Sequence, residues 1–372
     1  MRVCLIATEL FERGMYGGFG AATRAVAKGL LERGVDVTVV MTRRPGQKPV
    51  EFTDGMTVVA YPGQAYINVK KQRPFAALFK WIDADIYHSE EPSVGTYLAR
   101  LGAPDKKHAV TFRDPRRLDE HRTEWKEEGL DWRSLMRREW RYRTSYEFVK
   151  KAARAADGKY AAASVVIPRA MELYNLKQPP QFLPTPVPVP QRPLVKAAQP
   201  TVCFLGRWDP RKRPELFFEL AKRFPEVRFV AMGACQPHFK DRDTKLRAKY
   251  GVVPNLEMPG VMLGEEKSRI LEESWILINT SWREGLPISF IEAAAHRCAI
   301  LSYLNPDSFT EHFGYWAKED TLEALETGLR TLLADRCWEE KGRLGQNYVI
   351  ENFEYEHAID RHLKAYEELL KR

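Results

Sequence analysis

Two glutamates eight positions apart form the sharpest chemical pattern in this sequence. Glu284 follows a short apolar run, and Glu292 lies inside the helix predicted next, about two turns further along. A loop carboxylate at Glu284 can accept hydrogen bonds from sugar hydroxyls, and a helical carboxylate at Glu292 can bind a ribose diol. The alternative is a pair of solvated glutamates, but Phe290 and Ile291 beside Glu292 indicate a specific partner for that side chain.

The start of the same predicted helix is suited to hold an anion. Pro287 is favoured in a first helical turn, where its missing N–H is not needed. The backbone N–H groups around it are expected to be free at the positive end of the helix dipole. The residues predicted to bind the anion are Gly285, Leu286, Pro287 and Ile288.

A basic loop with glycine at its start is the second pattern. Gly206, Arg207 and Lys212 directly follow an apolar strand and precede a predicted helix. A diphosphate leaving group needs positive charge as its bond breaks, and Arg207 and Lys212 can supply that charge without a metal ion. The alternative is a basic surface loop with no ligand.

A glycine-rich stretch near the N-terminus is the third pattern. It contains Gly14, Gly17, Gly18 and Gly20 in the first strand-to-helix turn. Glycines there let the backbone approach a ligand closely. The spacing departs from the Gly-x-Gly-x-x-Gly pattern of dinucleotide-binding loops. Gly17, Gly18 and Gly20 are therefore predicted to bind a donor molecule.

These patterns belong to two alternating strand–helix series. Apolar runs near residues 1–7 and 35–41 enclose a helical pattern, the unit that builds parallel sheets. A proline-rich stretch then ends the first series, because proline lacks the N–H that a helix or central strand needs. The sequence predicts an α/β protein with two doubly wound domains that bind ligands in a central cleft. The predicted boundaries are 1–185, a linker at 186–200, 201–354, and a last helix at 355–372.

Composition restricts the class of protein further. The 372 residues exceed what one hydrophobic core usually supports, which agrees with two domains. No apolar run approaches the ~18 residues needed to span a bilayer, and the first apolar run is too short for a secretory signal. The five scattered cysteines form no zinc or redox motif and are expected to be free thiols in the cytoplasm. The net charge of +8 is modest for this length and fits a mixed charged surface.

Together, these segments resemble glycosyltransferase family 4, a retaining family of glycosyl transferases group 1 with the GT-B fold. The resemblance covers most of the chain. It rests on the glycine loop, residues 85–88 and 183–187, the Gly206–Lys212 loop and the segment between the two glutamates. It implies two Rossmann-like domains facing a central cleft, an N-terminal domain that binds the acceptor, and a C-terminal domain that binds the nucleotide sugar. The final helix would complete the N-terminal domain.

The same resemblance implies a role for each motif. Arg207 and Lys212 would hold the donor diphosphate, Glu284 the transferred sugar and Glu292 the nucleotide ribose. Residues near the base would be Gly233, Gly260 and Val261. Such enzymes generally need no metal, so neither a metal nor another cofactor is expected.

One position departs from the family pattern. Members often carry histidine where this chain has Arg113, followed by Asp114. Arginine cannot act as a base near neutral pH, but it can pair with a carboxylate or phosphate. One hypothesis is an anionic group of the donor or acceptor near Arg113, and the other is a local ion pair with Asp114 or another acid. His88 and Asp114 are also predicted as possible cleft residues, and the alternative for His88 is a buried structural histidine.

Aromatic and basic residues alternate in the segment from Trp132 to Arg143. Such a segment can rest on an anionic membrane and receive a lipid-linked acceptor there. It can also stack on nucleic acid, although that partner is disfavoured here. The third interpretation is an amphipathic helix with a solvated basic face.

The resulting expectation is a retaining hexosyltransferase that uses a UDP- or GDP-linked sugar. Its acceptor, whether a glycan, a lipid-linked molecule or a small molecule, is not specified by the sequence. No carboxylate suggests itself as a covalent nucleophile, so the expected mechanism is a front-face displacement assisted by the leaving diphosphate. The alternatives are a nucleotide-sugar epimerase on the same fold and a non-catalytic nucleotide-sugar-binding protein.

Overall fold

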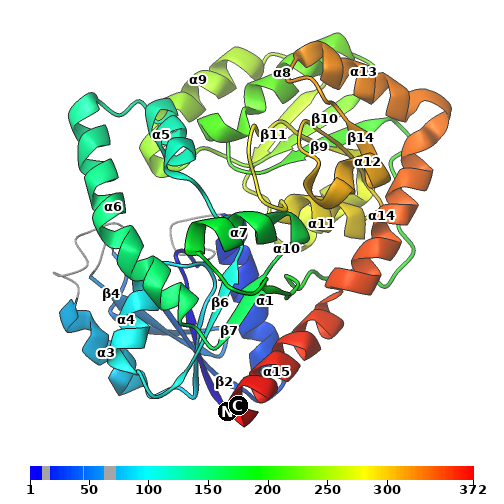
Figure 1. The fold of residues 1–372 in the computed structure, drawn as a ribbon. Coiled ribbons are helices and arrows are strands. Elements are labelled where there is room, and N and C mark those ends of the chain that lie inside the picture. Colours follow the sequence, from blue (N-terminus) through cyan, green and yellow to red (C-terminus); the bar gives the residue numbers. More distant parts are fainter. Residues whose placement is uncertain (11–16, 45, 63–72) are drawn as a thin grey trace. The chain divides into compact units, whose positions relative to one another are not determined.

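Two units, each built on its own sheet, make up the chain. A computed structural model describes residues 1–10, 17–44, 46–62 and 73–372, so Gly14 lies outside the described residues. One unit comprises Met1–Pro186 together with Tyr355–Arg372, and the other comprises Val187–Glu354 (Figure 1). The proline-rich segment after residue 186 runs with the second unit, where the N–H of Val187 donates to the carbonyl of Phe353 at 2.9 Å.

The first unit is built on a mixed sheet. In its described part the strand order is β3-β4-β2-β1-β5-β6-β7-β8, and only the β3–β4 pair is antiparallel. The strands are β1 (Arg2–Ile6), β2 (Asp36–Thr42), β3 (Val50–Thr53), β4 (Met56–Tyr61), β5 (Ile86–Ser89), β6 (Lys107–Phe112), β7 (Gly158–Ala161) and β8 (Gln181–Phe182). Leu5 of β1 lies opposite Val39 on one side and His88 on the other. The order reverses between β1 and β5, which makes that point the switch point of this sheet.

Helices cover this sheet, and one of them comes from the far end of the chain. They are α1 (Gly18–Glu32), α3 (Ala76–Ile82), α4 (Val94–Gly102), α5 (Leu118–Glu127), α6 (Trp132–Arg154), α7 (Ile167–Tyr174) and α15 (Tyr355–Lys371), with short 3₁₀ turns at η1 (Arg73–Phe75) and η2 (Ser164–Val166). The polar, basic stretch at 119–155, which the sequence predicts to be helical, forms two helices, α5 and α6. Gly129 has a φ of 76° after α5, and the side chain of Asp131 caps the start of α6 by accepting from the N–H of Ser134.

The last helix, α15, packs against α1 (Figure 1). Gly29 of α1 permits this approach, because a Cβ there would lie 2.3 Å from the Cδ1 atom of Ile359. Ile359 and Tyr366 of α15 are both fully buried. The C-terminal residues therefore belong to the core of the first unit. Among the described residues, none of the helices combines the length and apolar composition that crossing a bilayer requires.

The second unit contains a parallel sheet. In the described residues its order is β11-β10-β9-β12-β13-β14. The strands are β9 (Thr201–Leu205), β10 (Arg228–Met232), β11 (Leu256–Gly260), β12 (Ile276–Asn279), β13 (Ala299–Ser302) and β14 (Gly314–Trp316). This is the Rossmann order, and its direction reverses between β9 and β12.

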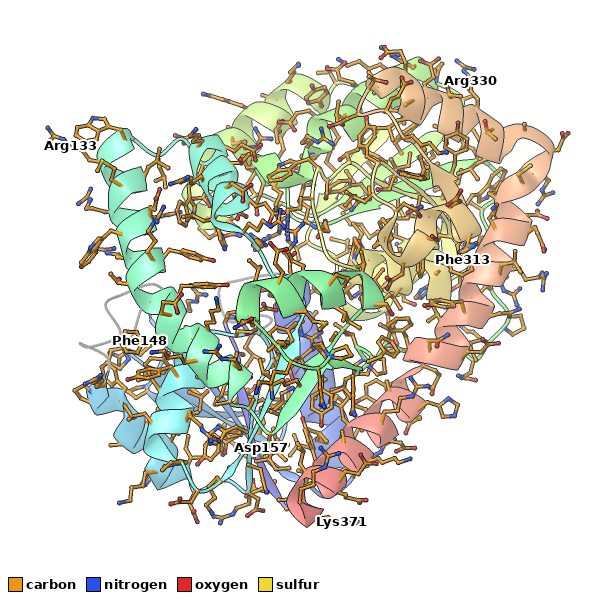
Figure 2. All side chains as sticks on the ribbon, in the orientation of Figure 1. Arg133, Phe148, Asp157, Phe313, Arg330 and Lys371 are labelled. Atoms are coloured by element: carbon orange, nitrogen blue, oxygen red, sulfur yellow. The ribbon has the colours of Figure 1, made fainter. Side chains whose placement is uncertain are left out.

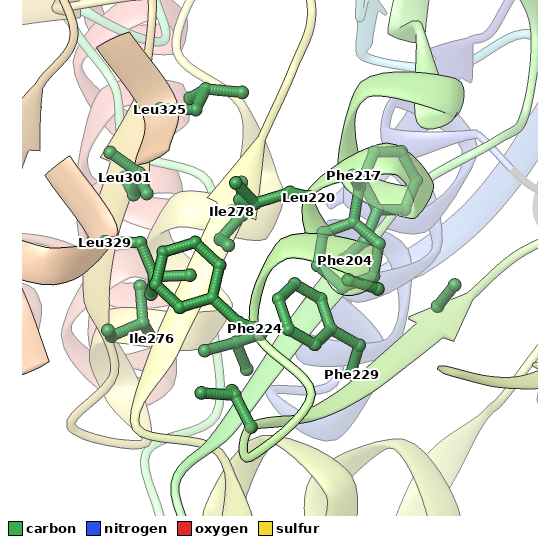
Figure 3. Close-up of a cluster of buried hydrophobic side chains, with 14 of the residues drawn as sticks. Phe204, Phe217, Leu220, Phe224, Phe229, Ile276, Ile278, Leu301, Leu325 and Leu329 are labelled. Carbon is green, nitrogen blue, oxygen red and sulfur yellow. The ribbon is translucent and has the colours of Figure 1, made fainter. Parts of the chain in front are cut away.

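The core of the second unit combines aliphatic side chains with a cluster of aromatic rings. Phe217 of helix α8 packs on Phe204 and Phe229 of the sheet, with ring centroids 5.8 and 5.1 Å apart (Figure 3). The helices are α8 (Pro214–Arg223), α9 (Lys240–Tyr250), α10 (Gly264–Glu273), α11 (Ile288–Ala295), α12 (Phe309–Phe313), α13 (Leu322–Leu333) and α14 (Cys337–Phe353). Short 3₁₀ turns lie at η3 (Pro210–Lys212), η4 (Pro237–Phe239), η5 (Pro306–Ser308) and η6 (Ala334–Arg336). This packed sheet provides a rigid base for the loops at its carboxyl edge.

Candidate functional site

Two loops meet at the switch point of the second unit. One follows β9 and contains Arg207 and Lys212, and the other follows β12 and contains Glu284. The hydroxyl of Thr280 donates to the carbonyl of Lys212 at 2.6 Å, which fixes one loop against the other. Parallel sheets of this order bind ligands at this edge, beside the switch point. The residues that the sequence analysis singled out in two separate motifs are therefore neighbours.

Lys212 and Glu284 form an ion pair between these loops. Both side chains are largely buried, with 14% and 11% of their surface exposed, and the hydroxyl of Ser281 donates to the same Glu284 oxygen at 2.7 Å. Burial would raise the pKa of Glu284, but attraction by Lys212 and Arg211 and the hydrogen bonds lower it to about 2. Burial lowers the pKa of Lys212, and Glu284 opposes that shift. Glu284 is consequently ionised at neutral pH and can only accept hydrogen bonds.

Arg207 is oriented by a carboxylate of its own loop. Its Nε lies 3.0 Å from an oxygen of Asp209, and the side chain of Gln236 donates to the same oxygen at 3.2 Å. Asp209 is buried, whereas Arg207 keeps 19% of its side chain exposed. The guanidinium is thus held beside the β9 loop with part of its surface open to solvent, and the loop retains an excess of positive charge.

Three predicted glycines lie at the ends of neighbouring strands. Gly206, Gly233 and Gly260 follow or end β9, β10 and β11, and the N–H of Gly233 donates to the carbonyl of Gly260 at 2.7 Å. Gly233 has a φ of 142°, and a Cβ there would come within 1.9 Å of the Gly206 carbonyl oxygen. Gly233 therefore lets adjacent strand ends approach closely. Val261 follows β11 and is half-buried.

The predicted anion-binding helix end needs one correction. Helix α11 begins at Ile288, and Pro287 is its N-cap with extended backbone angles rather than a residue of the first turn. Proline has no N–H, so Pro287 cannot donate to an anion. Gly285 and Leu286 belong to the preceding loop, and Ile288 and Ser289 are the first residues of the helix.

Glu292 has a partner that the sequence analysis missed. The ammonium of Lys267 on α10 donates to a Glu292 oxygen at 2.6 Å, and 19% of the Glu292 side chain is exposed. The next turn of α11 is tied to α10 as well, because the ring of His296 lies 2.8 Å from the Ser268 hydroxyl. No residue spacing in the sequence connects Lys267 to Glu292, because α10 and α11 become neighbours only when the chain folds.

The sequence predicts that Gly17, Gly18 and Gly20 lie in a strand-to-helix turn, whereas the structure places them at the start of helix α1. Gly17 is the N-cap of α1, while Gly18 and Gly20 lie inside its first turn. The carboxylate of Glu9 occupies this helix end and accepts from the N–H of Gly20 at 3.1 Å. A Cβ at Gly17 would lie 2.1 Å from the same carboxylate. The close approach at these glycines is therefore made by the chain's own Glu9.

Arg113 forms a local ion pair, as the second hypothesis stated, but with a different acid. It is 6% exposed and pairs with Glu90, and its Nη1 donates to the Thr185 hydroxyl at 2.7 Å. Asp114 instead holds Arg116 at 2.7 Å. Because the Arg113 guanidinium is buried and neutralised, the first hypothesis, an anionic ligand at this cation, receives no support from the geometry.

His88 is a buried structural histidine. It is 0% exposed, and its ring nitrogens lie 2.6 Å from the Tyr366 hydroxyl and 2.8 Å from the Thr111 hydroxyl. Burial lowers the pKa of His88 to about 4, so the ring is neutral at pH 7. The ring joins the last helix to strands β5 and β6 and does not face a cleft.

Glu91, next to the Arg113 loop, is a perturbed carboxyl group that the sequence analysis missed. One of its oxygens accepts from the N–H groups of Arg113 and Asp114 at 2.7 and 3.2 Å. Burial raises the pKa of Glu91 to about 8, and the charge of Asp114 contributes in the same direction. Glu91 lies just after the carboxyl end of β5, and a raised carboxyl pKa at such a position makes it a candidate functional residue. In the described part of the chain, histidine, cysteine and acidic side chains nowhere gather in a group of three or more that could hold a metal ion.

Comparison with solved structures identifies the architecture. The chain is similar to sucrose-phosphate synthase from Thermosynechococcus elongatus, with 16% identity, a TM-score of 0.76, and coverage of 100% of this chain and 99% of that one. It is also similar to HepE from Anabaena, solved with UDP and glucose, at 10% identity, a TM-score of 0.72 and coverage of 97% and 98%. A glycosyltransferase from Rickettsia africae aligns at 16% identity, a TM-score of 0.67 and coverage of 100% and 99%. The fold is GT-B.

Sequence comparison adds the class of enzyme. Residues 190–350, which include every candidate residue of the second unit, match the family described as Glycosyl transferases group 1. No curated protein matches the chain. The chain is a glycosyltransferase, and the residues that match this family lie in the second unit.

Proposed function

We propose that this glycosyltransferase is a retaining, metal-independent enzyme of family 4 that takes its sugar from a UDP- or GDP-linked donor. The observation that carries the proposal is the Lys212–Glu284 pair beside Arg207, at the switch point of the sheet in the group 1 domain. Arg207 and Lys212 suit the diphosphate of a nucleotide sugar, and the carboxylate of Glu284 beside them suits the hydroxyls of its sugar. UDP is the first donor nucleotide to test, because the similar HepE was solved with UDP.

In this proposal the two cations stabilise the leaving group. Arg207 and Lys212 bind the diphosphate, and negative charge that develops on it as the glycosidic bond breaks strengthens both contacts. Lys212 is held by Glu284 in the free protein, so donor binding redistributes its hydrogen bonds between Glu284 and the phosphate. The first N–H groups of α11 add positive potential near the same loop.

Glu284 and Glu292 orient the donor. Glu284 is ionised, so it can accept from two sugar hydroxyls and fix the ring against the diphosphate. Glu292 would accept from the ribose diol, with Lys267 holding the carboxylate in place. Gly206, Gly233, Gly260 and Val261 at the neighbouring strand ends would lie near the nucleotide base. No covalent carboxylate nucleophile is assigned, and the acceptor proton passes to the leaving diphosphate in a front-face displacement.

The acceptor is a glycan, a lipid-linked molecule or a small molecule bound by the first unit. We further propose that the enzyme is cytoplasmic and makes peripheral contact with the inner face of an anionic membrane. The observation that favours this contact is the aromatic and basic outer surface of α6.

The test is release of nucleoside diphosphate from a panel of UDP-, GDP- and ADP-sugars that includes UDP-glucuronate. Wild type is compared with Glu292→Gln and Arg207→Ala, and Lys364→Gln, an exposed lysine of α15, is the matched control. Release from one donor that both site variants abolish, and the control retains, would establish the donor and the site together. Formation of an isomeric sugar nucleotide would instead identify an epimerase. Nucleotide binding without any product would contradict the transferase proposal.

A further inference from the structure

An exposed apolar ridge runs along helix α6. Trp132, Met136 and Trp140 are 65%, 64% and 58% exposed, although tryptophan and methionine are usually buried. Their spacing of four residues places them on one face of the helix. Three large apolar side chains in one exposed row are unusual on a protein surface and indicate a binding surface.

A basic ridge runs beside the apolar one. Arg133, Arg137 and Arg141 each follow one residue of the apolar ridge, so they form a parallel row. Within the residues that the structure describes, none of the three has a carboxylate at ion-pair distance. Arg133 lies over the Trp132 ring at 5.3 Å, and Arg137 donates to the hydroxyl of Ser134 at 3.2 Å. Figure 2 shows Arg133 at the N-terminal end of α6, pointing away from the protein.

Other arginines of the α5–α6 region are neutralised. Glu139 pairs with Arg122 at 2.5 Å and with Arg143 at 2.9 Å, and Glu128 pairs with Arg138 at 2.6 Å. The fold therefore pairs these arginines with carboxylates. In the described residues the row beside the tryptophans has no such ion pair, although Arg137 and the carboxylate of Asp131 attract each other at longer range. The basic ridge is consequently a localised feature, distinct from the modest net charge of the whole chain.

From this arrangement we infer that the two ridges of α6 bind the anionic surface of a lipid bilayer. Tryptophan rings favour the boundary between headgroups and acyl chains, and arginines beside them bind lipid phosphates. The six residues span about 13.5 Å along one helix, which suits a flat surface. A single convex helix does not form the charged groove that tracks a nucleic acid strand. The inference rests on the membrane contact proposed above and deepens it, because it names the side chains of α6 that would make the contact.

The test is co-sedimentation of the full chain with vesicles. Vesicles of phosphatidylcholine alone are compared with vesicles that also contain phosphatidylglycerol, at low and high salt. We expect binding to the anionic vesicles that weakens at high salt. The triple variant Arg133→Gln, Arg137→Gln, Arg141→Gln should bind roughly 100-fold more weakly, because each cation near an anionic surface contributes about fivefold. Trp132→Ser with Trp140→Ser should also lose binding while the net charge is unchanged.

Two control variants test whether binding depends on α6 itself or only on net charge and exposed tryptophan. Lys240→Gln, Lys245→Gln and Lys249→Gln on exposed positions of α9 remove the same number of charges and should retain binding. Trp81→Ser removes another exposed tryptophan, at 68%, and should also retain it. Equal loss in the α9 variant, no binding to anionic vesicles, or preferential binding of a single-stranded oligonucleotide would each overturn the inference. Donor hydrolysis in solution should be the same in all variants, so failure here is distinguishable from failure of the proposed chemistry.

Discussion

Lys212 and Glu284 stand 72 positions apart in sequence and form one ion pair between the loops after β9 and β12. Each side chain therefore fixes the other at the place where the donor is proposed to bind. Lys212→Met removes a diphosphate contact, and Glu284→Gln removes a charged acceptor for the sugar. We expect each change to lower kcat about 10²–10³-fold, as loss of one preorganised electrostatic contact commonly does. The measurement is the rate of nucleoside diphosphate release at saturating donor.

The double variant tests whether the pair acts as a unit. If it does, Lys212→Met with Glu284→Gln will be little slower than the slower single variant. The matched control is the lysine–glutamate pair Lys222–Glu219 of the exposed α8 surface, 2.9 Å apart. Lys222→Met should leave the rate unchanged. Independent, multiplicative losses in the double variant would show that the two residues act separately.

Gly233→Ala should destabilise the second unit. The added Cβ meets the Gly206 carbonyl oxygen, and the φ of 142° is unfavourable for any other residue. We expect a loss of about 3 kcal/mol or more in the free energy of unfolding, from strain and overpacking together. The measurement is hydrogen exchange of the β9 and β10 amides.

Gly260→Ala is the comparison for this change. Gly260 has a φ of 90°, but nothing lies within 4 Å of its Cβ position. In Gly260→Ala only the backbone strain remains, so we expect the free energy of unfolding to fall by about 1–2 kcal/mol. Equal destabilisation by the two variants would mean that the clash with Gly206 contributes nothing.

The carboxyl group of Glu91 should make stability fall as pH rises through the neutral range. Its pKa is raised from 4.5 to about 8 on folding, so the folded chain binds a proton that the unfolded chain has released. Between these two pH values the folded state loses stability with increasing pH. Glu91→Gln stays neutral and can still accept from the N–H groups of Arg113 and Asp114. Near pH 8 the free energy of unfolding of Glu91→Gln should therefore exceed that of the wild type by about 1–2 kcal/mol.

The measurement is chemical denaturation of both proteins across that pH range. The difference between the two curves isolates Glu91 from other titrating groups, such as His88. A constant difference at all pH values would contradict the raised pKa.

The order of elements in the second unit could be predicted because its strands are short, buried and bounded by glycine or proline. The apolar run before Gly206 predicts a strand at Thr201–Leu205, and β9 has these bounds. The sequence also predicts a helix at 215–224, and α8 spans Pro214–Arg223. Helix α9 was not predicted, because its sequence is almost uniformly polar and gives no apolar periodicity. The break between α5 and α6 was also missed, although Gly129 and Asp131 are the residue types that end and begin helices.

The site was predictable only where both partners lay in recognisable motifs. Arg207, Lys212 and Glu284 follow strands, so the sheet brings them together. Lys267, Glu90 and Glu91 were missed because each acquires its partner through tertiary packing between distant segments. Arg113 shows the same limit, since the sequence suggested its neighbour Asp114 as a partner and the fold supplies Glu90.

Tyr366→Phe should loosen the attachment of α15 to the first unit. Tyr366 is fully buried, and its hydroxyl lies 2.6 Å from Nδ1 of His88, which is neutral because burial lowers the pKa of the ring to about 4. Nε2 of the same ring lies 2.8 Å from the Thr111 hydroxyl, so each ring nitrogen has one hydroxyl partner, whichever nitrogen carries the proton. Phenylalanine removes the partner of Nδ1 and leaves a buried ring nitrogen unpaired, which lowers the free energy of unfolding by about 1–3 kcal/mol.

The expected signature is faster hydrogen exchange in α15 and in β5, with the second unit unaffected. Tyr355→Phe is the matched control on the same helix, because its hydroxyl bonds to Glu32 at 3.0 Å on a partly exposed surface. Tyr355→Phe should lower the free energy of unfolding by less than about 0.5 kcal/mol, because water can replace the Tyr355 hydroxyl as the partner of Glu32. Equal effects of the two substitutions would show that the His88 contact does not fix the helix. A larger effect of Tyr366→Phe would establish that a single buried hydrogen bond links the C-terminal helix to the central strand next to the switch point.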